Sequence, residues 1–88
     1  MLKLKMRTIE SIGYNEVASA IFADGIETNV RNFATAEMAI RKIEAMKRIN
    51  NQESKHSFKN IDIYGRNLIY AEIIETNTST IVYYVEEI

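Results

Sequence analysis

The sequence predicts an α+β fold: a single small domain over residues 1–88, with an antiparallel sheet of five or six strands and one amphipathic helix packed on it. The chain has 88 residues, within the size range of one compact domain. In the middle part of the chain, apolar residues recur about every 3.6 positions, which is the period of an α-helix. Apolar runs bounded by turn residues lie on either side. The expected order of elements is therefore βββαβββ.

Three strands are expected before the helix. Residues 2–8 alternate apolar and cationic side chains, which is the pattern of a strand with one buried and one solvent-exposed face. Residues 17–23 and 26–30 flank Asp24 and Gly25. An Asp-Gly pair between two short runs favours a hairpin, because both residues tolerate the positive φ of a type I′ turn.

The helix is expected to begin after an N-cap at Thr35 and to end near Asn50 and Asn51. Glu37 lies in the first turn, where the helix dipole favours an anion. One face is apolar at the spacing that packs on a sheet. Its members are Ala36, Ala39, Ile40, Ile43 and Met46. The opposite face alternates in charge, which predicts a ladder of surface ion pairs. Its members are Glu37, Arg41, Glu44 and Arg48.

Three more strands are expected at residues 57–64, 68–75 and 80–87, joined by turns at 65–67 and 76–79. If Glu75 pairs with Thr80, both faces of the last hairpin are apolar. One face carries Leu68, Tyr70, Ile74, Ile81, Tyr83 and Val85, and the other carries Ile69, Ala71, Ile73, Val82 and Tyr84. A single helix can cover only one of these two faces. The N-terminal hairpin, another copy of the chain or a partner must then cover the second, because small monomers rarely expose large apolar patches.

Composition disfavours most enzymatic chemistry. The chain has no Cys, one His and three Gly. His56 by itself supplies neither a metal site nor an acid–base pair, and isolated glycines form no phosphate-binding loop. Asp62, Glu72 and Glu75 lie on strands whose successive side chains point to opposite faces, which separates the carboxylates. We therefore expect no enzyme, with no catalytic residues, metal site, cofactor or small-molecule substrate.

Composition also bears on location. No window approaches the roughly 18 to 20 apolar residues of a membrane span, and the alternating N-terminus is unlike a signal peptide, so no membrane partner is expected. The absence of Cys favours a cytoplasmic protein. Ile occurs 14 times and Asn eight times, whereas Pro and Trp are absent, a bias typical of AT-rich codons. This bias points to a low-GC bacterium or its phages and plasmids.

The second apolar face predicts protein–protein association. Tyr70, Tyr83 and Tyr84, beside Leu68 and Val82, resemble the aromatic content of interface cores. Internal packing under neighbouring strands is the alternative for these side chains. We expect a non-enzymatic interaction module, such as a small accessory or inhibitor protein of a phage or mobile element. It would dock this face or an edge strand onto a second copy, most simply as a homodimer, or onto a host protein.

A nucleic-acid-binding regulator is the less favoured alternative. The net charge of −1 conceals a basic segment, because residues 31–59 carry seven Lys and Arg against three Glu. With Phe58 and Tyr64 nearby, a basic strip would contact phosphates and stack on bases. Its members would be Arg31, Lys42, Lys47, Lys55 and Lys59. Against this function, the ion-pair ladder neutralises part of the charge, and no RNA-recognition or zinc-finger pattern occurs.

Overall fold

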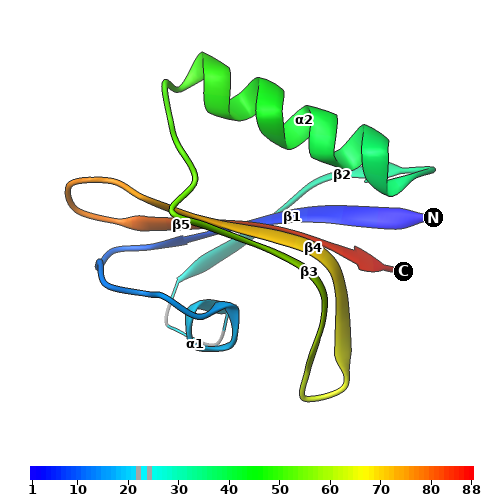
Figure 1. Ribbon diagram of the computed structural model, residues 1–88, viewed down its shortest axis with the longest axis horizontal. Coiled ribbons are helices and arrows are strands. Elements are labelled where there is room, and N and C mark those ends of the chain that lie inside the picture. Colours follow the sequence, from blue (N-terminus) through cyan, green and yellow to red (C-terminus); the bar gives the residue numbers. More distant parts are fainter. Residues whose placement is uncertain (22, 24) are drawn as a thin grey trace.

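The computed structural model describes residues 1–21, 23 and 25–88. Its elements are β1 (Leu2–Ile9), α1 (Val17–Ile21), β2 (Ile26–Phe33), α2 (Ala36–Ile49), β3 (His56–Ile63), β4 (Arg66–Glu75) and β5 (Thr80–Glu87) (Figure 1). The strands form one antiparallel sheet in the order β2-β1-β5-β4-β3. The α+β class and the five-stranded sheet are confirmed. The single helix and the order βββαβββ are wrong, because the described residues form two helices in the order βαβαβββ.

The difference lies in the predicted strand at residues 17–23. Val17, Ala20 and Ile21 of α1 are buried, and their spacing of three and four places them on one helical face. A short apolar run fits a strand and a buried helix equally well, so packing on the sheet decides between them. Phe22 and Asp24 lie outside the described residues. Gly25 permits a close approach to β1, because a Cβ there would lie 2.6 Å from the carbonyl oxygen of Thr8.

The second helix begins and ends where its sequence predicts. The Thr35 hydroxyl accepts a hydrogen bond from the Met38 N–H at 3.3 Å, and Asn50 is the C-cap. Ala39 and Ile43 are buried on the expected apolar face. This helix has 14 residues and α1 has five. Neither helix in the described part of the chain is long and apolar enough to cross a membrane.

The ion-pair ladder predicted along α2 is not formed. Glu44 binds Lys47 instead, with 3.0 Å between the carboxylate oxygen and Nζ. Arg41 and Arg48 have no carboxylate oxygen of a described residue within 4.0 Å. A tertiary contact holds Lys47 in this position, because its Nζ also lies 2.8 Å from the carboxylate of Glu72 on β4. A sequence pattern on one helix contains no information on such a partner.

The pairing of β4 with β5 follows the predicted register over most of its length. Glu75 pairs with Thr80, and the pairing continues in step to Tyr70. A bulge between Leu68 and Tyr70 then shifts the register, so that Leu68 pairs with Glu86. Leu68 therefore faces the side opposite to Tyr70, and the prediction that the two share a face is wrong.

The hairpin of β3 and β4 bends at the level of this bulge. Asn60 has a φ of 51°, a left-handed conformation that Asn tolerates better than most residues. Lys59 pairs with Tyr70 and Ile61 pairs with Leu68, so the irregularities of the two strands are adjacent. Figure 1 shows that the end of the hairpin turns toward the side of the sheet that carries α1.

Apolar clusters cover both sides of the sheet, which we call the α2 side and the α1 side. The cluster on the α2 side contains Leu4, Phe33, Ala39, Ile43, Tyr70, Ile74, Tyr83 and Val85. The cluster on the α1 side contains Ile9, Val17, Ala20, Ile21, Ile63, Leu68, Ala71, Ile73, Val82 and Tyr84. Two apolar faces are therefore present, as predicted. The N-terminal part of the chain covers the second one with a helix where the sequence predicts a hairpin.

Candidate functional site

The α1 side of the sheet is covered by a much shorter helix than the α2 side. A helix of 14 residues packs on four of the five strands on the α2 side, whereas the five residues of α1 pack on β4 and β5. Next to α1, the α1 side carries a network of charged side chains and an apolar groove. These two features form the candidate site.

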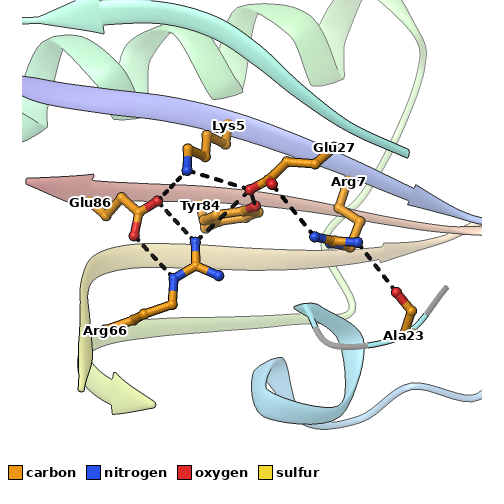
Figure 2. Close-up of polar contacts among 7 residues, drawn as sticks. All are labelled: Lys5, Arg7, Ala23, Glu27, Arg66, Tyr84 and Glu86. Atoms are coloured by element: carbon orange, nitrogen blue, oxygen red, sulfur yellow. Dashed lines mark hydrogen bonds and ion pairs between the residues drawn. The ribbon is translucent and has the colours of Figure 1, made fainter. Parts of the chain in front are cut away.

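Six side chains on the α1 side form a network that we call the charge cluster (Figure 2). They are Lys5, Arg7, Glu27, Arg66, Tyr84 and Glu86. Lys5 Nζ lies 2.7 Å from Oε1 of Glu86 and 3.5 Å from Oε1 of Glu27. The Tyr84 hydroxyl donates a hydrogen bond to Glu27. The network therefore joins β1, β2 and β5 across the sheet surface.

Two arginines extend the charge cluster to the elements beside the groove. Arg66, at the start of β4, binds Glu86 at 2.9 Å, and its guanidinium carbon lies 5.6 Å from the ring centroid of Tyr84. Arg7 donates a hydrogen bond of 3.3 Å to the carbonyl oxygen of Ala23, shortly after α1 (Figure 2). The charge cluster thus connects both the bent hairpin and the segment after α1 to the sheet.

The ionisation of the charge cluster is stable at neutral pH. The hydrogen bond from Tyr84 and the nearby cations Lys5 and Arg7 lower the pKa of Glu27. Burial alone would raise the pKa of Glu86, but hydrogen bonds from Arg66 and Lys5 outweigh it and lower that pKa. Burial and the bond to Glu27 raise the pKa of Tyr84 to about 12. These carboxylates stay charged and Tyr84 stays protonated, so they act as cross-links at neutral pH.

The groove lies between α1 and the bent hairpin and has a volume of about 360 Å³. Its apolar lining consists of Val17 and Ala18 from α1 and Phe58, Ile61, Ile63 and Tyr64 from β3 and the turn after it. Glu16 and Asp62 also line it. Because β3 is an edge strand of the sheet, this groove runs beside backbone groups that can pair with a further strand.

The turn after β3 displays an aromatic side chain in a strained conformation. The sequence predicts this turn at residues 65–67, but the structure places it at Tyr64 and Gly65, with φ values of 49° and 84°. Asp62 stabilises the turn by accepting a hydrogen bond of 3.0 Å from the Gly65 N–H. A left-handed φ costs a residue such as Tyr about 1 kcal/mol. The side chain of Tyr64 is nevertheless 89% exposed, so its burial does not compensate for this cost.

A buried carboxylate on the α2 side is a second unusual feature. Glu72 is only 2% exposed and binds Lys47 at 2.8 Å, while the Ser54 hydroxyl donates to the same oxygen. The other oxygen of Glu72 has no hydrogen-bond partner among the described residues. Burial and the negative charge of Glu72 raise the pKa of Tyr70 to about 12 and, in the same direction, that of Tyr83. These contacts join the end of α2 to β4.

The five residues predicted as a docking face are buried within the chain. Tyr70 and Tyr83 belong to the cluster on the α2 side, whereas Leu68, Val82 and Tyr84 belong to the cluster on the α1 side. The structure therefore does not bring the five together on one exposed surface. The two apolar faces on which the prediction depends are covered by α1 and α2.

The five basic residues predicted as a nucleic-acid-binding strip are dispersed. Arg31 lies on β2 and Lys59 on β3, which are opposite edges of the sheet, and Lys42 lies on α2. Lys47 and Lys55 are bound to carboxylates at 2.8 and 2.9 Å. These positions do not form one continuous strip.

Sequence reasoning identifies neither the charge cluster nor the groove. The alternating pattern of β1 places Lys5 and Arg7 on an exposed strand face, but their partners come from strands far away in the sequence. A Tyr-Gly pair between two apolar runs is a weak turn signal, because Tyr is uncommon at positive φ. In the described part of the chain, no group of three His, Cys, Asp or Glu side chains has the arrangement of a metal site.

Comparison with known proteins yields no match. No family model matches the chain, and no curated protein or solved structure is significantly similar to it.

Proposed function

We propose that the chain is a non-enzymatic protein-interaction module that binds an extended segment of another protein along the outer edge of β3. The observation that carries this proposal is the apolar groove beside that edge. In strand addition, the backbone of the added segment pairs with an edge strand, and alternate side chains enter pockets next to it. The groove between α1 and β3 is suitably placed for such side chains.

The size and lining of the groove support this binding mode. A volume of about 360 Å³ is within the range of sites that bury a small organic group or a few side-chain atoms. Tyr64 also lines the groove and is 89% exposed, and aromatic residues contribute strongly to binding energy at interfaces. A strained conformation retained at an exposed residue is also typical of functional positions.

Two observations favour a protein partner over the alternatives. In the charge cluster, the shifted pKa values keep Glu27 and Glu86 ionised and Tyr84 protonated at neutral pH. Groups that do not titrate near neutral pH suit a structural cross-link better than acid–base catalysis. The predicted basic strip is divided between opposite edges of the sheet, whereas binding to a nucleic acid needs clustered cations.

We propose that the partner at the β3 edge is a different protein. A second copy of the chain is the alternative there, and the test below distinguishes the two.

The composition supports a cellular setting for this function. A chain without Cys is typical of the cytoplasm, where disulfides are rare. The high Ile and Asn content supports an origin in an AT-rich genome. We propose a cytoplasmic accessory or inhibitor protein of a phage or mobile element.

Selection from a displayed library of random linear peptides tests the binding mode. Peptides that bind the wild-type chain are expected to slow amide hydrogen exchange in β3. Tyr64→Asn should weaken their binding by about 10-fold, because it removes an aromatic contact. The turn itself is retained, because Asn tolerates the left-handed conformation. Ile26→Asn is the matched control, since it removes an apolar side chain that is 74% exposed at the opposite edge, on β2.

Three results would overturn the proposal. One is the failure of any peptide to be selected. Another is a set of peptides that protect β2 or α2 and leave β3 unprotected. Protection of β3 by self-association in the absence of peptide, detected by light scattering, would replace the heterologous partner with a second copy.

A further inference from the structure

We infer that two copies of the chain pair antiparallel through their β2 edges, about a two-fold axis at Thr28, and form one continuous sheet. This surface is distinct from the β3 edge, so the inference does not rest on the proposed function. In the sheet order β2-β1-β5-β4-β3, no strand of residues 1–21, 23 or 25–88 pairs with the outer edge of β2. Such an edge is a template for a further strand.

The outer edge of β2 lacks the residues that commonly prevent strand pairing. Edge strands are often protected by Lys or Pro. Residues 26–30 contain neither, and their one charged residue is Glu27. The charge of Glu27 is balanced within the chain, because its carboxylate lies 3.5 Å from Lys5 Nζ and 3.6 Å from a guanidinium nitrogen of Arg7. A second strand therefore meets little uncompensated charge at this edge.

Three β-branched side chains of this segment face the α2 side of the sheet. Thr28 pairs with Met6 on β1, and Met6 and Val30 both pack against the cluster on the α2 side. Ile26 lies two residues before Thr28 and faces the same side. The side chain of Ile26 is 74% exposed, although strand pairing usually covers residues of this type. This row is the apolar part of the proposed interface.

The two polar residues between them face the α1 side. Glu27 pairs with Arg7 and Asn29 pairs with Lys5, and both cations belong to the charge cluster. Glu27 and Asn29 are exposed. The segment therefore offers alternating side chains to both faces of a joined sheet.

Pairing about Thr28 makes this segment complementary to itself. A two-fold axis there places each residue before Thr28 opposite the residue equally far after it in the second copy. Ile26 then lies opposite Val30, and Thr28 lies opposite Thr28, which are favourable cross-strand pairs. Glu27 lies opposite Asn29, whose amide can donate a hydrogen bond to the carboxylate. This complementarity identifies the occupant of the edge as a second copy of the chain.

The bulge in β2 disfavours the neighbouring register. An axis at Asn29 would place Glu27 opposite Arg31 of the second copy. Arg31 faces the α2 side, because its guanidinium carbon lies 5.5 Å from the ring centroid of Phe33 in the cluster there. Glu27 faces the α1 side, so these opposite charges would not meet. The register about Thr28 keeps every pair on one side of the sheet.

Light scattering behind size-exclusion chromatography, run over a range of concentrations, measures the association. We expect the mass to rise from 10.2 kDa toward twice that value. The dissociation constant should be roughly micromolar, because a pairing of one short segment is smaller than a standard interface. Amide hydrogen exchange in β2 should slow as the dimer forms. In this arrangement both β3 edges lie at the outer ends of the sheet, so each copy keeps its groove.

Charge reversal at the axis tests the register. Thr28→Lys and Thr28→Glu each place like charges directly opposite one another and should weaken the dimer by about 5-fold. A mixture of the two variants should form a heterodimer at least as tight as the wild-type dimer. A loss of folding in either variant would not be corrected by mixing. Thr78→Lys is the matched control, because Thr78 is an exposed threonine in the turn between β4 and β5.

A cross-link provides an independent measurement. The chain has no Cys, so Thr28→Cys introduces a single thiol that lies opposite its own copy. Directly opposed residues of antiparallel strands are close enough for a disulfide. Mild oxidation should convert Thr28→Cys to a covalent dimer, whereas Thr78→Cys should stay largely monomeric under the same conditions.

The two edges are separated by one further variant. Ile26→Asn should weaken the dimer and leave the affinity of a free peptide for β3 unchanged. A mass of 10.2 kDa at every concentration would overturn the inference. So would a dimer that neither charge variant weakens, or a loss that mixing does not restore. None of these results affects peptide binding at β3, and a library without β3-binding peptides would leave the dimer intact.

Discussion

The α2 side of the sheet is closed by a helix of 14 residues, with an apolar cluster and a buried ion pair beneath it. The α1 side is closed by a helix of five residues and by the partly exposed charge cluster. The long helix packs on four strands, whereas the short helix leaves a groove of about 360 Å³ beside an edge strand. The comparison predicts that α2 contributes more to stability than α1 and that the α1 side retains a surface for binding.

The largest expected effect comes from breaking the ion pair on the α2 side. Lys47→Met leaves the buried carboxylate of Glu72 without its cation and should lower the free energy of unfolding by about 3 kcal/mol. Urea denaturation followed by circular dichroism measures this loss. The double variant Lys47→Met, Glu72→Leu should recover most of it, because the uncompensated charge is then absent.

Lys55→Met is the control for this prediction. It removes the exposed partner of Glu75 and should change the free energy of unfolding far less. Equal losses for the two single variants would show that burial does not distinguish these pairs and would contradict the contrast between the two sides.

Truncation of apolar side chains compares the two helices directly. Ile43 in α2 is fully buried, and Ile43→Ala should cost about 3 kcal/mol. Val17 in α1 lines the open groove, and Val17→Ala should cost about 1 kcal/mol, because fewer methyl groups are lost and water can reach the space. Thermal and urea unfolding of both variants test this order. A larger loss for Val17→Ala would mean that α1 contributes more to the core than its length indicates.

Acidification tests the role of the charge cluster on the α1 side. The pKa values of Glu27 and Glu86 are lowered in the folded chain, so their stabilising effect is present above the ordinary carboxyl pKa of 4.5 and is lost as the pH falls through the lowered values. Wild type should therefore become less stable below about pH 4.5. Glu27→Gln should cost about 1 kcal/mol at pH 7 and reduce the acid dependence. An unchanged acid dependence in Glu27→Gln would exclude Glu27 as a contributor.

The smallest expected effect is a gain in stability at the turn after β3. Tyr64→Asn relieves an unfavourable left-handed φ and should raise the free energy of unfolding by about 0.5 kcal/mol. Tyr64→Phe keeps the ring and the same backbone strain, so it should lack this gain. A destabilised Tyr64→Asn would indicate that the ring contributes to folding, which would weaken its assignment to binding.

Part of the fold can be predicted because local patterns and tertiary contacts agree. Thr35 is both a favourable N-cap residue and the observed cap of α2. The register that joins Glu75 to Thr80 follows from a short polar turn between two apolar runs.

The prediction for residues 17–23 is wrong because a short apolar run does not specify a helix or a strand. The prediction for Leu68 is wrong because a bulge changes the alternation of side chains.

The candidate site is not predictable because it joins segments that are distant in the sequence. Glu27 on β2 binds Tyr84 on β5, and Arg66 on β4 binds Glu86 on the neighbouring strand β5. The groove requires both the position of α1 and the bend at Asn60, and neither is encoded by a local period. Charge counts show a basic segment at residues 31–59, but not which side chains meet.

Sequence patterns alone predict the fold class, the limits of α2, most of the pairing of the last hairpin and the presence of two apolar faces. These properties depend on the periodicity of side chains and on capping and turn preferences, which act over a few residues. The tertiary structure decided that residues 17–21 form a helix, that the five residues predicted as a docking face lie in two cores, and that a groove stays open beside β3. These outcomes depend on which surfaces are buried together, and burial is a property of the whole chain.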